Sequence, residues 1–259
     1  MVPVAPIKSP RLIWPATAPP VSLVDGEVHV WAWTFTGASS PQEEDLRILD
    51  DHERQRAARF HFVPDRIRYS LCHASMRRIL ASYLNRSPES LIFRERPGGK
   101  PELVLSSSDP QIRFNLSHSK SVALLAVALN IEVGADVEDI RPIEPGVAAR
   151  YFSTAELASL APLRSQEWLD AFYRCWTRKE AILKAEGLGL RIPLESFDVT
   201  LRAGEPAELL GARPEAKLTA QWHLHHLSPA DGIMAALAVG DSAAQVVAHC
   251  LPNLSRTEP

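Results

Sequence analysis

The sequence predicts an α+β fold, and three observations lead to this prediction. The apolar pattern gives the order strand, helix, strands, and then helix and strands again. The two halves of the chain resemble one another in this pattern, and we find no short-period repeat. The composition is ordinary for a globular protein, with 46% hydrophobic and 23% charged residues. The 259 residues are therefore enough for one large domain or two smaller ones.

The first 26 residues predict little regular structure. They contain six of the 21 prolines, so we expect a leader that is disordered or lies over the surface. Val28–Trp33 follows as a strand of β-branched and aromatic residues. Ser40 then offers an N-cap, with Pro41 at the first helical position and Glu43 at the third, so a helix is expected to begin here.

The middle of the chain predicts a long helix followed by strands. Residues 65–83 carry apolar side chains at helical spacing, which indicates one buried side. The glycines and prolines of residues 97–101 predict an exposed loop. Residues 112–116 alternate and predict a short strand. Residues 122–129 are apolar throughout, as expected for a strand that is covered on both faces.

The last third predicts another helix and further strands. A capping box begins at Ser153. Apolar residues at helical spacing from Leu169 to Leu183 predict a helix that ends at Gly187 or Gly189. Three strands are expected to close the chain, at residues 197–201, 218–224 and 233–239.

Charge and cysteine content exclude several classes of protein. A net charge of −3 argues against general nucleic-acid binding. Three cysteines without CxxC spacing argue against a disulfide framework and a zinc site, and Cys72 and Cys175 are expected to be buried. We see no signal peptide and no apolar run of membrane-spanning length, so a cytoplasmic protein without a membrane partner is expected. From Arg47 to Arg78, eight arginines oppose four acids, which indicates either a solvated helical face or a local anion site.

Three carboxylates and a lysine form the main candidate site. In the alternating segment 131–138, Asp136 and Glu138 lie two residues apart, so both side chains emerge on one face of a strand. Glu180 and Lys184 lie one helical turn apart. The alternative for the strand is that its two carboxylates are solvated acids at the strand end. The alternative for the helix is that Glu180 and Lys184 form a surface ion pair. Together, the carboxylates suit a hard cation such as Mg²⁺, which takes its other ligands from water and phosphates, and the lysine suits a pyrophosphate.

Ser117 and His118 follow a predicted strand. They do not make a catalytic triad, because neighbouring residues point apart and the chain has no G-x-S-x-G sequence. A serine hydroxyl and a protonated histidine can instead bind phosphate. The alternative is that His118 is a structural histidine.

These signals follow one another in a characteristic order. The order is GKP, FNLSHS, GADVE and FYRCWTRKEAILKAEGLGL. With it, residues 28 to about 240 resemble the 4′-phosphopantetheinyl transferases of the large, surfactin-synthetase-activating type. The resemblance implies two similar α/β subdomains related by a pseudo-twofold, here expected at residues 27–130 and 131–259, with the active site in the cleft between them. The second would hold the metal site, and a monomer would suffice.

The resemblance also implies substrates and a cofactor. Coenzyme A would be the donor, a serine of an apo acyl or peptidyl carrier protein the acceptor, and Mg²⁺ the cofactor. Asp136, Glu138 and Glu180 look like the metal ligands, and Lys184 looks like a pyrophosphate contact. Glu180, or a water that it orients, looks like the base for the acceptor hydroxyl, and Lys179 is the rival base.

The nucleotide end of coenzyme A has its own expected contacts. They are Lys100, Ser117 and His118. Arg54 and Arg56 lie in the basic segment that helps to bind the nucleotide phosphate in the family. Glu53 and Tyr69 stand where some members have a lysine and a threonine, which leaves phosphate binding from that side open.

Two other functions are weighed against transfer. A catalytically inactive protein that binds carrier proteins or coenzyme A would need a broken metal set, whereas all three carboxylates are present. An Mg²⁺-dependent nucleotide pyrophosphohydrolase would cleave coenzyme A without a protein acceptor, and it does not explain the full motif order. The carrier is expected to dock near residues 152–163 and the start of the helix that contains Trp176. Fatty-acid, polyketide and nonribosomal-peptide carriers all remain open.

Overall fold

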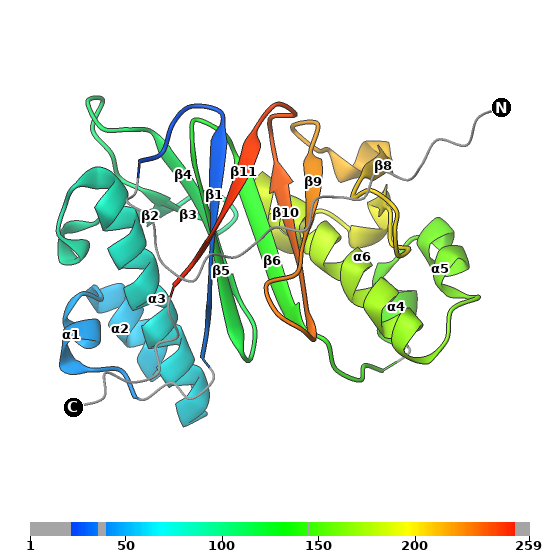
Figure 1. Cartoon of the computed structure of the whole chain (residues 1–259), viewed down its shortest axis with the longest axis horizontal. Coiled ribbons are helices and arrows are strands. Elements are labelled where there is room, and N and C mark those ends of the chain that lie inside the picture. The colour runs from blue at the N-terminus through cyan, green and yellow to red at the C-terminus, as the bar shows by residue number, and fades with distance from the viewer. Residues whose placement is uncertain (1–21, 36–39, 145, 252–259) are drawn as a thin grey trace.

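The computed structural model describes residues 22–35, 40–144 and 146–251, so most of the expected leader lies outside the described residues. The fold is α+β, as predicted, with two main sheets. The first sheet contains β11 (Gln245–Cys250), β1 (Glu27–Thr34), β5 (Val122–Leu129) and β4 (Ile112–His118), in this order. The second contains β6 (Val133–Asp139), β10 (Ile233–Val239) and β9 (His223–Leu227). Figure 1 shows the two sheets side by side in the middle of the molecule.

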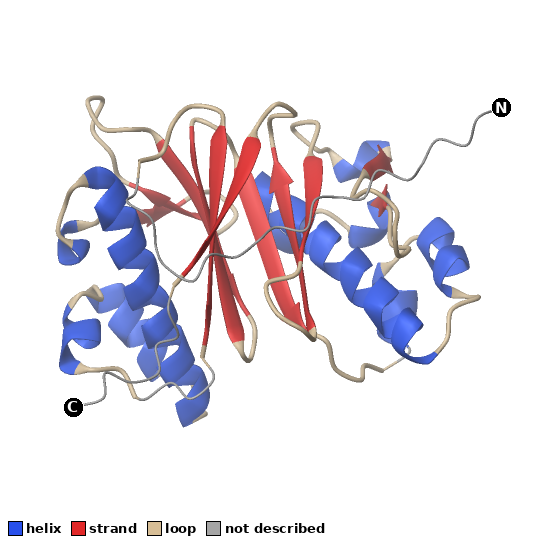
Figure 2. Ribbon diagram, viewed as in Figure 1, coloured by secondary structure: helices blue, strands red, loops and turns tan. Residues whose placement is uncertain are grey.

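Helices lie at both ends of this central body (Figure 2). At one end are α1 (Glu43–Arg47), α2 (Asp51–Ala58) and α3 (Val63–Leu84). At the other end are α4 (Gly146–Tyr151), α5 (Thr154–Leu160) and α6 (Ser165–Glu186). Two short hairpins complete the fold, β2 (Phe93–Glu95) with β3 (Pro101–Leu103), and β7 (Phe197–Val199) with β8 (Leu209–Ala212). In the part of the chain that the structure describes, every helix is too short or too polar to cross a membrane.

The core has three layers of apolar side chains. One layer lies between the sheets and joins residues of β1 and β5, such as Val30 and Leu124, to residues of β6 and β10, such as Ala135 and Leu237. The other two layers lie under α3 and under α6. Strand β5 is therefore buried on both faces, which confirms the prediction from its uninterrupted apolar run.

Side chains connect the two sheets where β4 lies beside β6. Asn115 Oδ1 accepts a hydrogen bond from the Ala135 N–H at 2.8 Å, and Ser117 Oγ accepts one from the Val137 N–H at 3.4 Å. Strands β4 and β6 are thus joined by hydrogen bonds between side chains and backbone, and not by the backbone hydrogen bonds of one continuous sheet. Asn115 and Ser117 lie on the polar face of β4, which is turned toward β6. The contact places Ser117 directly beside Asp136.

Helix α6 lies unusually close to β6. A Cβ atom on Gly134 would lie 2.1 Å from the Ala181 carbonyl oxygen and 2.3 Å from the Ala185 nitrogen, so only glycine permits this contact. The close approach carries Glu180 and Lys184 of α6 toward the acidic end of β6.

Several element boundaries agree with the predictions. The long helix predicted at residues 65–83 is α3, and the helix predicted to end at Gly187 or Gly189 ends at Gly187, whose φ of 70° is left-handed. The Ser153 capping box and the strand at 233–239 are also confirmed. Cys72 and Cys175 are both buried.

Two predicted boundaries are wrong. Helix α1 begins at Glu43 with Gln42 as its N-cap, not Ser40, because Asp45 completes the reciprocal hydrogen bonds with Gln42. The strand expected at 218–224 is β9, which begins only at His223. A single helical turn precedes it and ends at Lys217, whose left-handed φ of 46° interrupts any extended run.

Strand β11 was not predicted. It pairs in parallel with β1, from Glu27 opposite Gln245 to Ala32 opposite Cys250. A segment from the end of the chain thus lies in the sheet that the first half builds. The local sequence does not identify this partner, because the two strands lie at opposite ends of the chain.

Candidate active site

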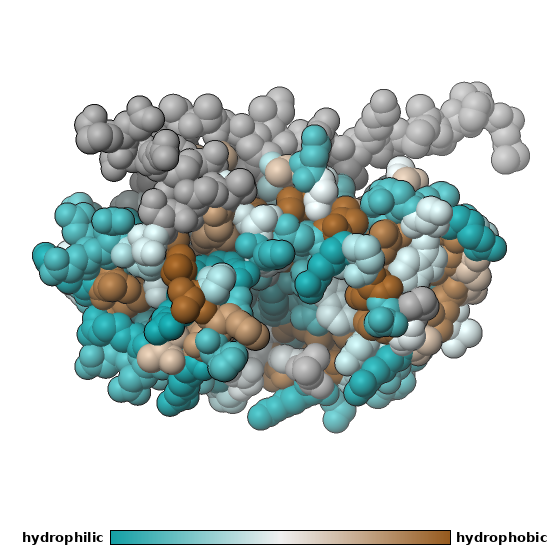
Figure 3. All heavy atoms as spheres, turned by 90° about the horizontal axis from the view of Figure 1, so that it is seen from below, coloured by the Kyte–Doolittle hydropathy of each residue, from teal (hydrophilic) through white to brown (hydrophobic). Residues whose placement is uncertain are grey.

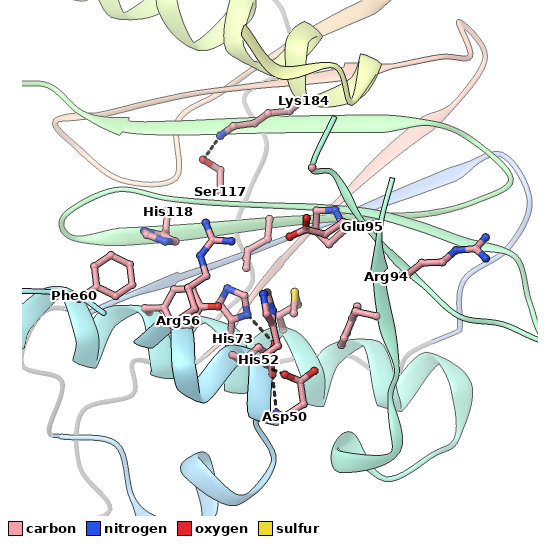
Figure 4. A pocket seen from close by; sticks show the side chains of 17 residues that line it. Asp50, His52, Arg56, Phe60, His73, Arg94, Glu95, Ser117, His118 and Lys184 are labelled. Carbon is pink, nitrogen blue, oxygen red and sulfur yellow. Dashed lines mark hydrogen bonds and ion pairs between the residues drawn. The ribbon is translucent and has the colours of Figure 1, made fainter. Parts of the chain in front are cut away.

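Three of the predicted site residues meet where β4, β6 and α6 converge. Lys184 Nζ lies 2.5 Å from Asp136 Oδ1 and donates a hydrogen bond to Ser117 Oγ at 2.8 Å. Ser117 Oγ in turn donates to Asp136 Oδ1 at 3.1 Å. Figure 4 shows Lys184 and Ser117 joined above a pocket. Segments that are distant in the sequence therefore build one charged cluster.

Lys184 offsets only part of the negative charge of Asp136, Glu138 and Glu180. Asp136 is 4% exposed, and its Oδ2 atom is buried without a hydrogen-bond partner among the described residues. Burial and the charge of Asp136 raise the pKa of Glu138 to about 7. The same two causes raise the pKa of Glu180, and Lys184 only partly offsets them. Such carboxylates are stabilised by a cation among them.

The donor atoms fit a hard divalent cation, although the described residues do not form a closed ligand set. Among them, no group of three or more His, Cys, Asp or Glu side chains is close enough to hold a metal ion, and Lys184 pairs with Asp136 instead. The unpartnered Oδ2 of Asp136 and the raised pKa values of Glu138 and Glu180 mark oxygens that a cation would satisfy.

Metal-free protein should lose stability as the pH rises, because of Glu138. Its folded pKa of about 7 lies above its ordinary value of 4.5, so between these values the folded protein holds a proton that the unfolded chain has released. The free energy of unfolding should therefore fall from about pH 4.5 to 7, and this contribution should level off above that range. Melting temperatures in EDTA across the range measure it. Glu138→Gln cannot titrate and should show a shallower decline, whereas parallel curves would exclude Glu138 as the cause.

A cavity of about 530 Å³ opens beside Lys184. Of the predicted nucleotide contacts, Arg56, Ser117 and His118 line it, together with side chains from α2, α3 and the β2–β3 hairpin (Figure 4). Desolvation by the surrounding walls lowers the pKa of His118 to about 4, and the positive charges of His73 and other cations nearby add to this. Arg56, Arg94 and Lys184 line the cavity as cations, while the acids Asp50 and Glu53 of its wall are paired with Arg77 and His73, so an anionic ligand has cationic partners there.

A second cavity of about 750 Å³ adjoins the first, since Phe60 and His118 line both. Glu138 and Arg141 line its other side. Seen from below, the molecule has hydrophilic residues around a recess between its two halves, with apolar residues on either side (Figure 3). The site therefore has room on both sides of His118, which two substrates would require.

Lys100 lines a smaller cavity with Glu180 and Lys184, but its ammonium group does not join the cluster of Lys184, Asp136 and Ser117. Its Nζ atom donates to Glu132 Oε2 at 2.9 Å and to the carbonyl oxygens of Val133 and Ala185 at 3.0 Å each. Burial lowers its pKa, and only 8% of the residue is exposed. The ammonium group has three donors, and all three are engaged within the protein. The structure therefore gives Lys100 the role of holding the β2–β3 loop against β6 and α6.

Two further predicted residues point elsewhere. Arg54 is exposed and bonds to the Leu49 carbonyl and to Asp51 at 2.8 Å, away from the cavity that Arg56 lines. Lys179 is fully buried and forms an ion pair with Glu156 at 2.8 Å. An amine held in the core in this way does not reach an acceptor hydroxyl, so we do not retain Lys179 as a base.

The structure adds residues that sequence reasoning missed. Asn115 positions β4, and its spacing of two residues from Ser117 in a strand was an available signal. Asp139 accepts hydrogen bonds from Ser119 Oγ at 2.6 Å and from the Ser121 N–H at 3.0 Å. It thereby holds the turn that follows His118 against the end of β6. His73 lines the first cavity from α3, and no local pattern singled it out.

Comparison with known proteins identifies the family of this chain. The N-terminal region of 4′-phosphopantetheinyl transferases matches residues 34–130, and the 4′-phosphopantetheinyl transferase superfamily matches residues 132–244. The 4′-phosphopantetheinyl transferase HetI of Nostoc sp. (strain PCC 7120) is 34% identical over 228 residues, which cover 87% of this chain and 93% of HetI. The chain belongs to the 4′-phosphopantetheinyl transferase superfamily.

Other members of the superfamily match less of the chain. The 4′-phosphopantetheinyl transferase Sfp of Bacillus subtilis (strain 168) is 31% identical over 62% of this chain and 71% of Sfp. The 4′-phosphopantetheinyl transferase psf-1 of Bacillus pumilus is 32% identical over 73% of this chain and 79% of psf-1. In this 4′-phosphopantetheinyl transferase, Ser117 and His118 fall in the first matched region, and all three candidate metal ligands fall in the second.

Proposed function

We propose that this chain transfers the 4′-phosphopantetheine group from coenzyme A to a serine of an apo carrier protein and releases 3′,5′-ADP. The observation that carries the proposal is the cluster of Lys184, Asp136 and Ser117 beside a cavity that Arg56 and Arg94 also line. Superfamily membership supports the same reaction. Fatty-acid, polyketide and nonribosomal-peptide carriers are all candidate acceptors.

The reaction forms one bond and breaks one. The acceptor serine oxygen attacks the β-phosphorus of the coenzyme A pyrophosphate, and the bond to the bridging oxygen breaks as 3′,5′-ADP leaves. Lys184 Nζ, between α6 and β4, stabilises the charge that grows on the pyrophosphate. Ser117 and His118 orient the nucleotide end. Positioning of two bound substrates supplies much of the acceleration.

Glu180 is the proposed base for the acceptor hydroxyl. A carboxylate at this position can accept the hydroxyl proton as the serine oxygen attacks. A water that Glu180 orients serves the same purpose. Proton removal of this kind contributes on the order of 10²–10⁴-fold.

Mg²⁺ is the proposed cofactor. Asp136, Glu138 and Glu180 would hold it, since their oxygen atoms are those that hard cations prefer. When bound, it would supply neutralisation of the phosphoryl oxygens. Its arrival would also satisfy the unpartnered Oδ2 of Asp136.

Two similar α/β subdomains, at residues 27–130 and 131–259, complete the proposal, with strand β11 of the second half added to the sheet of the first. Helices α3 and α6 support the pseudo-twofold, because each has 22 residues and each packs on the outer face of one sheet. The site lies where the sheets meet, between β4 and β6. One chain supplies all the proposed site residues, so a monomer suffices.

The carrier is proposed to dock on a groove of about 580 Å³ over α4, α5 and the start of α6. Leu157, Leu160 and Trp168 give the groove an apolar lining, and Arg164 adds a positive charge. An acidic amphipathic helix matches both features. This surface overlaps the segment that the sequence indicated.

Intact masses of carrier proteins test the reaction. The protein is incubated with coenzyme A, Mg²⁺ and a panel of apo carriers of the three classes, with EDTA as the control. We expect one carrier or more to gain the mass of one phosphopantetheine, and no gain with EDTA. Coenzyme A bound without any gain would instead show an inactive binding protein. Coenzyme A cleaved without a modified carrier would show a pyrophosphohydrolase.

A further inference from the structure

Glu53 and Tyr69 lie in the helical wall of the first cavity. They are the two positions at which the sequence did not decide how the phosphate is bound. Glu53 of α2 is 5% exposed, and both of its carboxylate oxygens are engaged. Oε1 lies 2.8 Å from His73 Nδ1, and Oε2 accepts from Arg77 Nε at 2.7 Å. Arg77 is fully buried and also binds Asp50. Glu53 therefore faces inward as a partner of His73 and Arg77 and presents no free oxygen to a ligand.

Tyr69 orients His73 from the other direction. The two residues lie one helical turn apart on α3, and their rings stack with centroids 4.0 Å apart and planes 27° apart. Contacts to Glu53 and Tyr69 fix the imidazole by its Nδ1 edge and by one face. The opposite nitrogen, Nε2, has no hydrogen-bond partner among the described residues, and the side chain is 21% exposed. His73 lines the cavity, so Nε2 is available to a ligand there.

Two further side chains that can donate a hydrogen bond to an anion lie on the walls that face this nitrogen. Arg56 of α2 lies with its guanidinium 5.9 Å from the centre of the Tyr69 ring, and His118 lies across the cavity on β4. Figure 4 shows Arg56 and His118 near one another, with His73 on the helical wall. Burial would raise the pKa of Glu53, but its bond to His73 and the charges of His73 and Arg77 lower it overall. The Glu53 carboxylate is thus ionised and paired with His73 and Arg77, and Arg56 forms no ion pair among the described residues.

We propose that His73 recognises the phosphomonoester at the nucleotide end of the donor and sets the preference for a donor that carries it. In the complex, the imidazole holds a proton on each nitrogen, with Nδ1 donating to Glu53 and Nε2 donating to the phosphate. Arg56 and His118 complete the anion site. This inference rests on the proposed function in one respect, namely that the donor is coenzyme A.

Direct binding without a carrier tests the role of His73. Calorimetric titration of the full chain gives one Kd for coenzyme A and one for dephospho-coenzyme A. The ratio of these two Kd values measures the preference for the donor that carries the phosphate. We expect His73→Ala to raise the Kd for coenzyme A about tenfold, the size typical of one charge-assisted hydrogen bond, and to leave dephospho-coenzyme A within about twofold. His73→Lys should recover part of the ratio, because it restores a cation. His61→Ala, which changes an exposed histidine outside the cavity, is the matched control.

Two outcomes would overturn the inference. Equal losses with both donors would show that His73 only packs the wall or stacks the base, and an unchanged ratio would show that it does not contact the phosphate. If His73→Ala fails to fold, His73→Asn retains a donor toward Glu53 at the place of Nδ1, lacks one at the place of Nε2, and carries the same comparison. Failure of the proposed function is distinguishable, because it appears as absent transfer by the wild-type protein even if that protein still prefers coenzyme A.

Discussion

Asp136→Ala should reduce phosphopantetheine transfer at least about 10²-fold, because the proposed site is built around this carboxylate. Its Oδ1 atom is bonded to Lys184 and to Ser117, and its Oδ2 atom is buried without a partner among the described residues. The substitution removes a proposed metal ligand and at the same time frees Lys184 Nζ from its ion-pair partner. Initial rates of carrier modification, measured over a Mg²⁺ titration, give the effect.

Two companion variants make the result specific. Glu180→Gln removes a ligand and the proposed base while it preserves size, so it should show a comparable loss. Glu44→Gln changes an exposed acid of α1 and should leave the rate unchanged. Melting temperatures check that all three variants fold. Wild-type turnover by Asp136→Ala or by Glu180→Gln in Mg²⁺ would show that the metal assignment is wrong.

The chemical groups of this site follow from local sequence patterns. Strand alternation places Asp136 and Glu138 on one face, and helical spacing places Glu180 and Lys184 on one side. Each pattern involves only a few neighbouring residues. The close contact between strand β6 and helix α6 does not follow from such local patterns, because it depends on the absence of a side chain at Gly134. Only the packed structure shows that this glycine is a contact point.

Lys100 shows where local patterns mislead. The glycines and prolines around it indicate an exposed loop, and Gly98 and Gly99 are indeed exposed. The acceptors of its ammonium group come from Glu132, Val133 and Ala185, which are distant in the sequence. A loop pattern carries no information about such partners. The lysine is therefore buried within a loop whose remaining residues behave as predicted.

His73 and β11 were missed for the same physical reason. Within the pattern of α3, His73 is one polar position among many, and its environment comes from Glu53 on α2 and His118 on β4. Strand β11 joins β1 from the other end of the chain. Long-range pairing decides both features, whereas periodicity reports only which way a side chain faces within its own element.

Lys179→Ala should lower the free energy of unfolding by about 3–5 kcal/mol, the usual cost of removing one partner of a buried ion pair. Lys179 Nζ lies 2.8 Å from Glu156 Oε1 and donates to the carbonyl oxygens of Leu194 at 2.7 Å and Phe197 at 2.5 Å. Glu156 is 2% exposed and also accepts from the Val199 N–H at 2.9 Å. Loss of the ammonium group would leave a buried charge and two buried carbonyls without their donor. Denaturant unfolding, with exposed Lys120 changed to alanine as the control, measures the difference.

The same position separates a structural lysine from a catalytic base. If Lys179 acts only in the core, Lys179→Ala should retain its kcat per folded molecule at a temperature where it is folded. The double variant Lys179→Met with Glu156→Gln removes both charges and keeps their volume, so it should recover much of the lost stability. A catalytic base would give the opposite result, with wild-type stability and a greatly reduced kcat. Because the amine is enclosed by acceptors from α5, from Leu194 before β7 and from Phe197 at the start of β7, we expect the structural outcome.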